Sequence, residues 1–154
     1  MTIWKPGRRL FTVAAVLMLL TASAHTMGAL SPWPDGPAER KLLAEMRGYV
    51  LSMGMGMNPS VFDIYRDLSF TMSITLAALG IMNLVLAASR DATDALLRRA
   101  GWVNAVWVGA FLALNYAFQI PPPLLCAVVI EAVVLLALFV PSRGQLAPGA
   151  LERQ

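Results

Sequence analysis

Residues 57–70, MNPSVFDIYRDLSF, connect a loop to a hydrophobic helix, and they decide how the chain is organised. An asparagine–proline pair breaks regular structure first, and Asn58 or Ser60 can then cap a helix that begins near Val61. Asp63 falls in the early turns of this helix, where the helix dipole favours a negative charge. The stretch is the densest run of polar and aromatic side chains in a mostly apolar chain, so the apolar segments are predicted to surround it.

The composition indicates a lipid bilayer. Of 154 residues, 58% are hydrophobic and 14% charged, whereas a soluble domain has about 45–50% apolar and about 25% charged residues. Long apolar runs point the same way, and the length fits a single membrane domain over residues 1–154. Cys126 is the only cysteine, which excludes an intrachain disulfide and a cysteine-based zinc site.

Four membrane-spanning helices are predicted, at about residues 10–30, 67–89, 101–118 and 124–140. The first holds 21 residues, which at about 1.5 Å per residue match the roughly 30 Å of a hydrocarbon core. A cleavable signal peptide is the alternative for this segment, because Ala22-Ser23-Ala24 satisfies the small-x-small cleavage rule. Residues 90–99 are interpreted as a charged connection, and the prolines at 121–123 as a tight turn.

An amphipathic helix is predicted between the first two spans, at about residues 38–53. Its apolar residues recur every three or four positions, and charged residues occupy most of the other side. Trp33, in the proline-rich turn before it, suits a membrane interface. Residues 145–154 are interpreted as a disordered tail. The predicted fold class is therefore all-α, an integral membrane four-helix bundle with an outer amphipathic helix between spans 1 and 2.

The cationic residues predict the orientation. The chain ends and the 90–99 connection hold eight of them: Lys5, Arg8, Arg9, Arg90, Arg98, Arg99, Arg143 and Arg153. The 31–67 region holds four: Arg40, Lys41, Arg47 and Arg66. The positive-inside rule then places both termini in the cytoplasm and the 31–67 region outside, in a bacterial inner membrane. The positive-inside rule accounts for the placement of these cationic residues, so nucleic acid is not an expected partner.

Glu131 is the one acidic residue well inside a predicted span, about eight residues or roughly 12 Å from the outer turn. A charge at this depth costs at least a few kcal/mol, so the carboxyl group should face the bundle and be protonated or paired. It either handles protons or a ligand, or forms an interhelical hydrogen bond as a neutral acid. His25 and Asn115 lie at similar depths in the first and third spans. The same two interpretations, a ligand site or a structural hydrogen bond, apply to each of them.

One outward-facing polar pocket is the functional hypothesis for these residues. Its candidate lining residues are His25, Tyr65, Arg66, Asp67, Asn115 and Glu131. The alternative is that they only hold the bundle together through interhelical hydrogen bonds, each contributing about 0.6–2 kcal/mol. Asn83 and Asn104, toward the cytoplasmic ends of the second and third spans, are interpreted as a structural bond between helices.

The residues at 53–57 alternate methionine and glycine, and Met53, Met55 and Met57 are weak candidates for Cu(I), which prefers soft thioether ligands. Methionine also fills irregular apolar contacts, which is the structural alternative. No cofactor is expected otherwise. There is no phosphate loop, His-Glu-x-x-His, Gly-x-Ser-x-Gly or Cys-x-x-Cys, and a single histidine cannot form a two-histidine metal site.

Residues 24–28, Ala-His-Thr-Met-Gly, and residues 62–66, Phe-Asp-Ile-Tyr-Arg, carry a resemblance. Together with the layout of the whole chain, they resemble an uncharacterised family of small four-span bacterial membrane proteins. That family has a His-Thr-x-Gly-like motif at the end of helix 1 and an aromatic-Tyr motif entering helix 2. Arg66 and Asp67 stand where its pattern has glycine. The resemblance implies the fold and no established activity, and the layout is similar to DoxX-like proteins in architecture only.

Two classes of function follow. The first is a non-enzymatic membrane component with an outward-facing polar pocket, whose partners are the lipid bilayer and either further copies of the chain or a larger membrane complex. The second is a small membrane oxidoreductase, or a quinone- or lipid-modifying enzyme, that uses His25 and Glu131 to move protons. Proton-coupled transport or metal handling is a third possibility.

Overall fold

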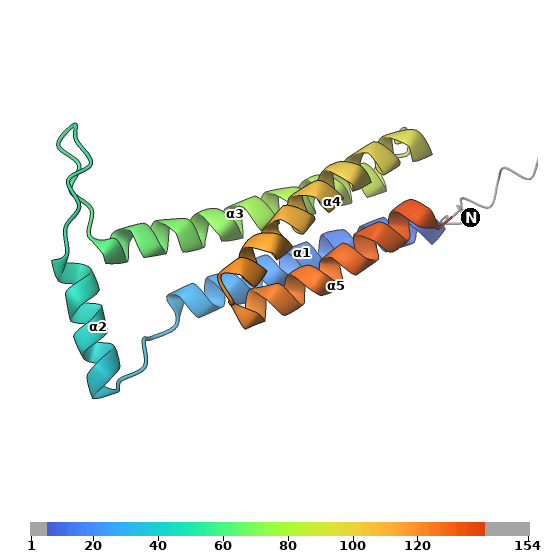
Figure 1. The fold of residues 1–154 in the computed structure, drawn as a ribbon. Coiled ribbons are helices and arrows are strands. Elements are labelled where there is room, and N and C mark those ends of the chain that lie inside the picture. The colour runs from blue at the N-terminus through green and yellow to red at the C-terminus, as the bar shows by residue number, and fades with distance from the viewer. Residues whose placement is uncertain (1–5, 141–154) are drawn as a thin grey trace, which may run out of the picture. The chain divides into compact units, whose positions relative to one another are not determined.

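The computed structural model describes residues 6–140, and the predicted tail at 145–154 lies outside them. The described chain is all-helical, with no β-strand, as predicted (Figure 1). Its helices are α1 (Pro6–Leu30), α2 (Pro37–Gly48), α3 (Val61–Ala88), α4 (Asp94–Ala117) and α5 (Pro121–Phe139).

Three of these helices are long and apolar enough to cross a membrane: Gly7–Leu30, Val61–Ala88 and Pro121–Phe139. They identify a membrane protein. Helix α4, the predicted third span, is not among the three, since Asn104 and Asn115 interrupt its apolar residues.

The chain divides into two compact units. Among the described residues, unit 1 consists of residues 6–18 and 79–140, and unit 2 of residues 19–78. Helices α1 and α3 each contribute to both units.

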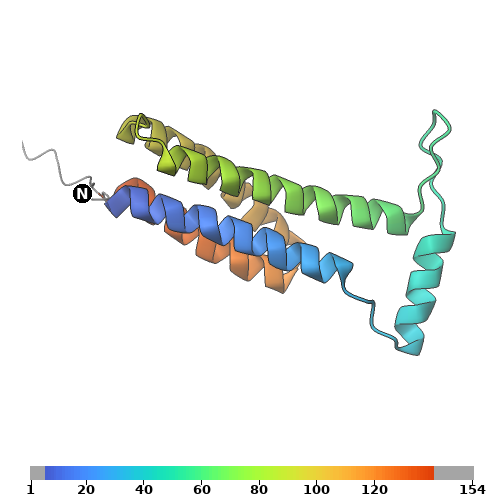
Figure 2. The same cartoon turned by 180° about the vertical axis from the view of Figure 1, so that it is seen from behind.

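Helices α4 and α5 pack against each other in unit 1 and are joined by a short turn (Figures 1 and 2). Gly101 allows close packing, because a Cβ atom there would lie 2.8 Å from Cδ2 of Leu138. Near that contact, the rings of Trp102 and Phe139 meet edge to face, with centroids 6.2 Å apart.

Both helices begin earlier than the predicted spans. Helix α4 begins at Asp94, inside the predicted connection, because Thr93 caps it: the Thr93 hydroxyl accepts a hydrogen bond from the Leu96 N–H at 3.2 Å. Helix α5 begins at Pro121, so the three prolines form its first turn. Proline fits there because the first N–H groups of a helix have no intrahelical partner.

The most buried polar contact of unit 1 joins α3 to α4. Asn83 Nδ2 donates to Asn104 Oδ1 at 3.2 Å, and Asn104 Nδ2 donates to Asn83 Oδ1 at 3.1 Å. Asn83 also contacts the Met18 sulfur of α1, 3.6 Å from Nδ2. Both asparagines are 1% exposed. The predicted structural bond between these helices is confirmed.

Arg8 fastens α1 to the end of α3 within the same unit. Its Nη2 donates to the carbonyl oxygens of Ser89, at 3.2 Å, and Ala92, at 2.8 Å. Carbonyl groups at and just past a helix C-terminus have no intrahelical partner, and a cation there also complements the helix dipole. Phe11, Ala87, Ala92 and Leu97 form a buried apolar cluster nearby.

Helix α2, in unit 2, is shorter than the amphipathic helix predicted for residues 38–53. It ends at Gly48 because Tyr49 is extended, and residues 49–61 pair as a short hairpin. Val50 and Ser60 face each other across it. None of the side chains of α2 is buried.

Helix α3 begins at Val61, as predicted, with Ser60 as its cap. The Ser60 hydroxyl accepts from the Asp63 N–H at 3.2 Å, and Asp63 Oδ2 accepts from the Ser60 N–H at 3.0 Å and from its hydroxyl at 2.6 Å. This reciprocal arrangement is a capping box in which aspartate replaces the usual glutamate.

Replacing Asn83 or Asn104 with leucine should lower the free energy of unfolding by about 1–3 kcal/mol, because each change leaves the other buried amide unpaired. The double variant should lose less than the sum of the two, with a coupling of about 1 kcal/mol. Thermal unfolding of the purified protein in detergent measures all three. Additive losses would contradict the pairing, and Asn115→Leu serves as a control because its amide bonds only within α4.

Candidate ligand pocket and polar sites

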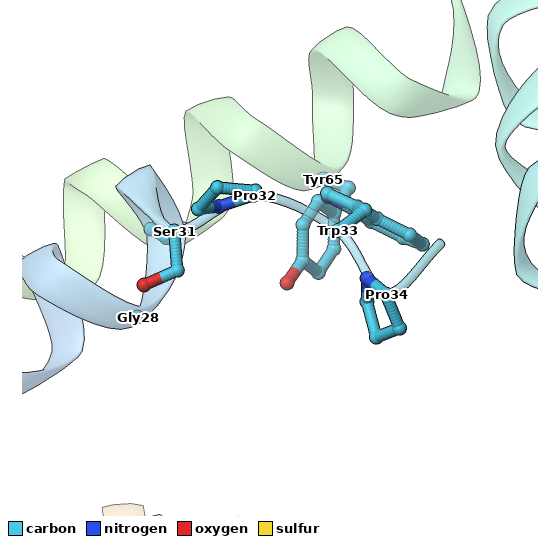
Figure 3. Close-up of a pocket in the computed structure, with 7 residues that line it drawn as sticks. Gly28, Ser31, Pro32, Trp33, Pro34 and Tyr65 are labelled. Atoms are coloured by element: carbon cyan, nitrogen blue, oxygen red, sulfur yellow. The ribbon is translucent and has the colours of Figure 1, made fainter. Parts of the chain in front are cut away.

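An open pocket of about 260 Å³ lies in unit 2, where α1 ends (Figure 3). Its lining residues come from the last turn of α1, the linker to α2 and the second turn of α3: Gly28, Ala29, Ser31, Pro32, Trp33, Pro34 and Tyr65. The helix stops before Pro32, which cannot continue it, and the Ser31 N–H bonds back to the Gly28 carbonyl oxygen at 3.2 Å. The Ser31 hydroxyl donates to the Met27 carbonyl oxygen at 2.8 Å.

Trp33 forms one wall of the pocket, and two rings of α3 hold it. Its ring meets Phe62 edge to face at 6.0 Å between centroids and Tyr65 at 5.8 Å. Phe62 and Tyr65 are three residues apart, so they share one face of the helix. Such contacts add about 0.5–1.5 kcal/mol each beyond the area they bury, and the prolines on both sides of Trp33 restrict its backbone further.

Two guanidinium groups support the same aromatic residues. The Arg47 Cζ atom lies 4.8 Å from the centroid of the Phe62 ring. The Arg66 Cζ atom lies 5.9 Å from the Phe62 centroid and 5.6 Å from that of Phe70. Phe62 therefore connects the end of α2, the linker and α3.

The predicted pocket residues of unit 2 have different environments. Tyr65 lines the pocket, whereas Arg66 lies against Phe62 and Phe70, and Asp67 is exposed. His25 is half-buried, and its Nε2 atom is buried with no hydrogen-bond partner among the described residues.

The two predicted residues of unit 1 are not hydrogen-bonded to each other. The Asn115 amide donates to the Phe111 carbonyl oxygen at 2.8 Å, in its own helix. Glu131 lies opposite Gly109, whose added Cβ would stand 3.8 Å from Glu131 Oε1. Glu131 Oε2 is buried and has no hydrogen-bond partner in the described chain.

Sequence reasoning missed most of the pocket wall. Trp33 was interpreted only as an interface residue, Gly28 was named only as the end of the 24–28 motif, and Ser31 was not singled out. The available signal was local: a tryptophan between two prolines, directly after a helix end, is held in place by backbone restriction. Which side chains it would meet depends on α3, more than twenty-five residues further along the chain.

No cluster of three or more His, Cys, Asp or Glu side chains that could hold a metal ion occurs within residues 6–140. Comparison with protein-family models, curated proteins and solved structures finds no match to this chain.

Phe62→Leu should release Trp33, because it removes one edge contact and the ring face under two guanidinium groups, together about 1–2 kcal/mol. We expect the Trp33 emission to shift to longer wavelength and its quenching by acrylamide to increase, in a chain whose other three tryptophans are phenylalanine. Phe70→Leu is the matched control, since Phe70 contacts Arg66 but not Trp33. Unchanged emission in the Phe62 variant would contradict the role given to this ring.

Proposed function

We propose that this protein is a non-enzymatic, four-span component of a bacterial inner membrane that binds a small amphipathic molecule in its Trp33–Tyr65 pocket. Both termini are in the cytoplasm, and unit 2 carries the pocket at the outer boundary of the membrane. The observation that carries the proposal is Trp33 itself, fixed edge-on against Phe62 and Tyr65 beside an open volume of about 260 Å³.

The hydrogen bonds of α4 support its assignment as a membrane span, the third of four along the chain. Its 24 residues extend for about 36 Å, enough for a hydrocarbon core. Its two asparagines are satisfied inside the protein, Asn104 by Asn83 and Asn115 by a carbonyl of its own helix. Polar side chains paired in this way do not present unsatisfied groups to lipid.

The chemistry of the pocket favours an amphipathic ligand. Tryptophan, tyrosine and two prolines provide apolar surface, while the Tyr65 hydroxyl provides a polar group. Tryptophan and tyrosine concentrate at membrane–water interfaces, because they combine an apolar ring with a polar atom. A pocket with these walls, directly after an apolar helix, suits a molecule that also has an apolar part and a polar part, such as a lipid.

Assembly with another chain is part of the proposal, as a homo-oligomer or as an accessory subunit of a membrane complex. Its support is that His25 and Glu131, polar residues of two apolar helices, are each only partly buried in the single chain. The exposed part of each side chain is open to contact with a neighbouring chain.

Gly28→Leu should abolish ligand retention without destabilising the protein. Gly28 lines the pocket, and a Cβ there meets nothing within 4 Å, so a larger side chain enters the pocket space. Native mass spectrometry of protein purified with its membrane lipids measures the bound adduct, and the free energy of unfolding should change by less than about 0.5 kcal/mol. Gly48→Leu is the control: it too is helical and unobstructed, but it lies away from the pocket. Equal retention in both variants, or none in the unmodified protein, would contradict the proposal.

The topology is tested by single cysteines in a Cys126→Ser background. Ser52→Cys and Ile120→Cys should react with a membrane-impermeant maleimide in cells with a permeabilised outer membrane, and Ala95→Cys only after the inner membrane is also opened. All three positions are exposed. If position 120 labels from the same side as position 95, α4 does not cross the membrane and the four-span topology is wrong.

A further inference from the structure

We propose that Met53, Met55 and Met57, at the tip of the hairpin in unit 2, form a binding site for a soft monovalent metal ion, Cu(I) or Ag(I). The proposal rests on the register of the hairpin, on the backbone at its tip and on the donor atoms present there. It is independent of the pocket function.

The register brings two of the methionines face to face. Val50 pairs with Ser60, and the Leu51 N–H bonds to the Pro59 carbonyl oxygen at 2.9 Å. Counting inward, Met53 stands opposite Met57, and the Met53 N–H bonds to the Met57 carbonyl oxygen at 3.1 Å. The Met57 N–H bonds to Gly54 instead of Met53, so Met53 and Gly54 together oppose Met57, as at a β-bulge. Met53 and Met57 are joined by a backbone hydrogen bond across the hairpin, and their flexible thioether side chains can reach one ion.

Met55 occupies the tip in an unusual backbone conformation. The turn is closed by the Met57 N–H, which donates to the Gly54 carbonyl oxygen at 2.9 Å. Its central residues, Met55 and Gly56, have φ values of 49° and 78°, the signs of a type I′ turn. Asparagine, aspartate and glycine are the residues preferred at such positions, since other side chains are strained there.

Packing does not explain the presence of methionine at this position. The Met55 side chain is 93% exposed, and Met53 and Met57 are each more than half exposed. A strained residue with no packing contact points to a function of its side chain. Three of the nine methionines of the chain fall within these five residues, separated by glycines that leave the space around the sulfur atoms open.

The donor set selects the class of ion. Residues 48–62 contain no charged residue, histidine or cysteine, so the tip offers neither carboxylates for Mg²⁺ or Ca²⁺ nor the usual ligands of Zn²⁺. Thioethers are soft ligands that favour Cu(I), and Ag(I) shares this preference without changing its oxidation state. The binding proposed here involves no redox step.

The experiment uses the full chain in detergent, labelled with ¹³C at the methionine methyl groups and carrying Cys126→Ser, because a thiol would compete for a soft metal. Silver nitrate is titrated in chloride-free buffer and followed by ¹H–¹³C correlation spectra. We expect the methyl signals of Met53, Met55 and Met57 to shift together and saturate near one silver ion per chain. Bicinchoninate competition with Cu(I) under anaerobic conditions gives the affinity.

Met53→Leu and Met57→Leu should each weaken binding by at least about tenfold, since even loss of an outer-shell partner costs a metal site that much. The matched controls are Met27→Leu and Met82→Leu, whose methionines are also exposed but lie outside the hairpin. Leucine preserves the apolar volume and removes only the sulfur, so folding should be unaffected.

Two results would overturn the proposal. One is equal binding by the Met53→Leu/Met55→Leu/Met57→Leu variant and the unmodified chain. The other is insertion of the tip into lipid: in nanodiscs, a spin-labelled lipid would broaden these three methyl signals and silver would no longer shift them.

Discussion

The reciprocal amide pair between Asn83 and Asn104 is the contact on which unit 1 depends. A buried amide is expensive in apolar surroundings unless each of its donors and acceptors is used. Here each asparagine satisfies the other, and the register of α3 against α4 is constrained by the pair. Apolar contacts alone specify register weakly, since one leucine is much like its neighbours. A polar pair has one position where both bonds form, so it selects one arrangement among many of similar packing.

The same reasoning explains why the ends of unit 1 are polar. Carbonyl groups at the end of α3 need partners, and Arg8 donates to Ser89 and Ala92 there. From sequence, Arg8 was interpreted only as a topology signal. The structure gives it a second role, because its hydrogen bonds bring the start of α1 beside the end of α3. The amide pair joins α3 to α4 and the Arg8 bonds join α1 to the end of α3, so polar contacts link three helices of unit 1.

The sequence was sufficient wherever the signal is local or periodic. The apolar periods gave the helices, and Ser60 with Asp63 gave the start of α3. The asparagine pair was predicted because polar residues in apolar helices seek one another. The prediction of a tight turn at the three prolines was wrong. They begin α5, because proline costs nothing at the first positions of a helix. The pocket wall could not be predicted, since Trp33 meets Phe62 and Tyr65 only through the path of residues 34–61. That path includes a hairpin with three successive positive φ angles, at Gly54, Met55 and Gly56.

Hydrogen bonding separates polar side chains that the sequence treats alike. Asn83, Asn104, Asn115, His25 and Glu131 are all polar residues in apolar helices. The sequence predicted a structural bond for Asn83 and Asn104, and it left a ligand site or a structural bond open for the other three. The three asparagines have partners, so the fold itself accounts for them. His25 Nε2 and Glu131 Oε2 have none among the described residues, although both are buried. Glu131 lies beside Gly109, which has no side chain and so offers no side-chain donor to the carboxyl group. An unpaired buried carboxyl oxygen costs free energy on folding, so the internal hydrogen bonds that account for the asparagines do not account for Glu131.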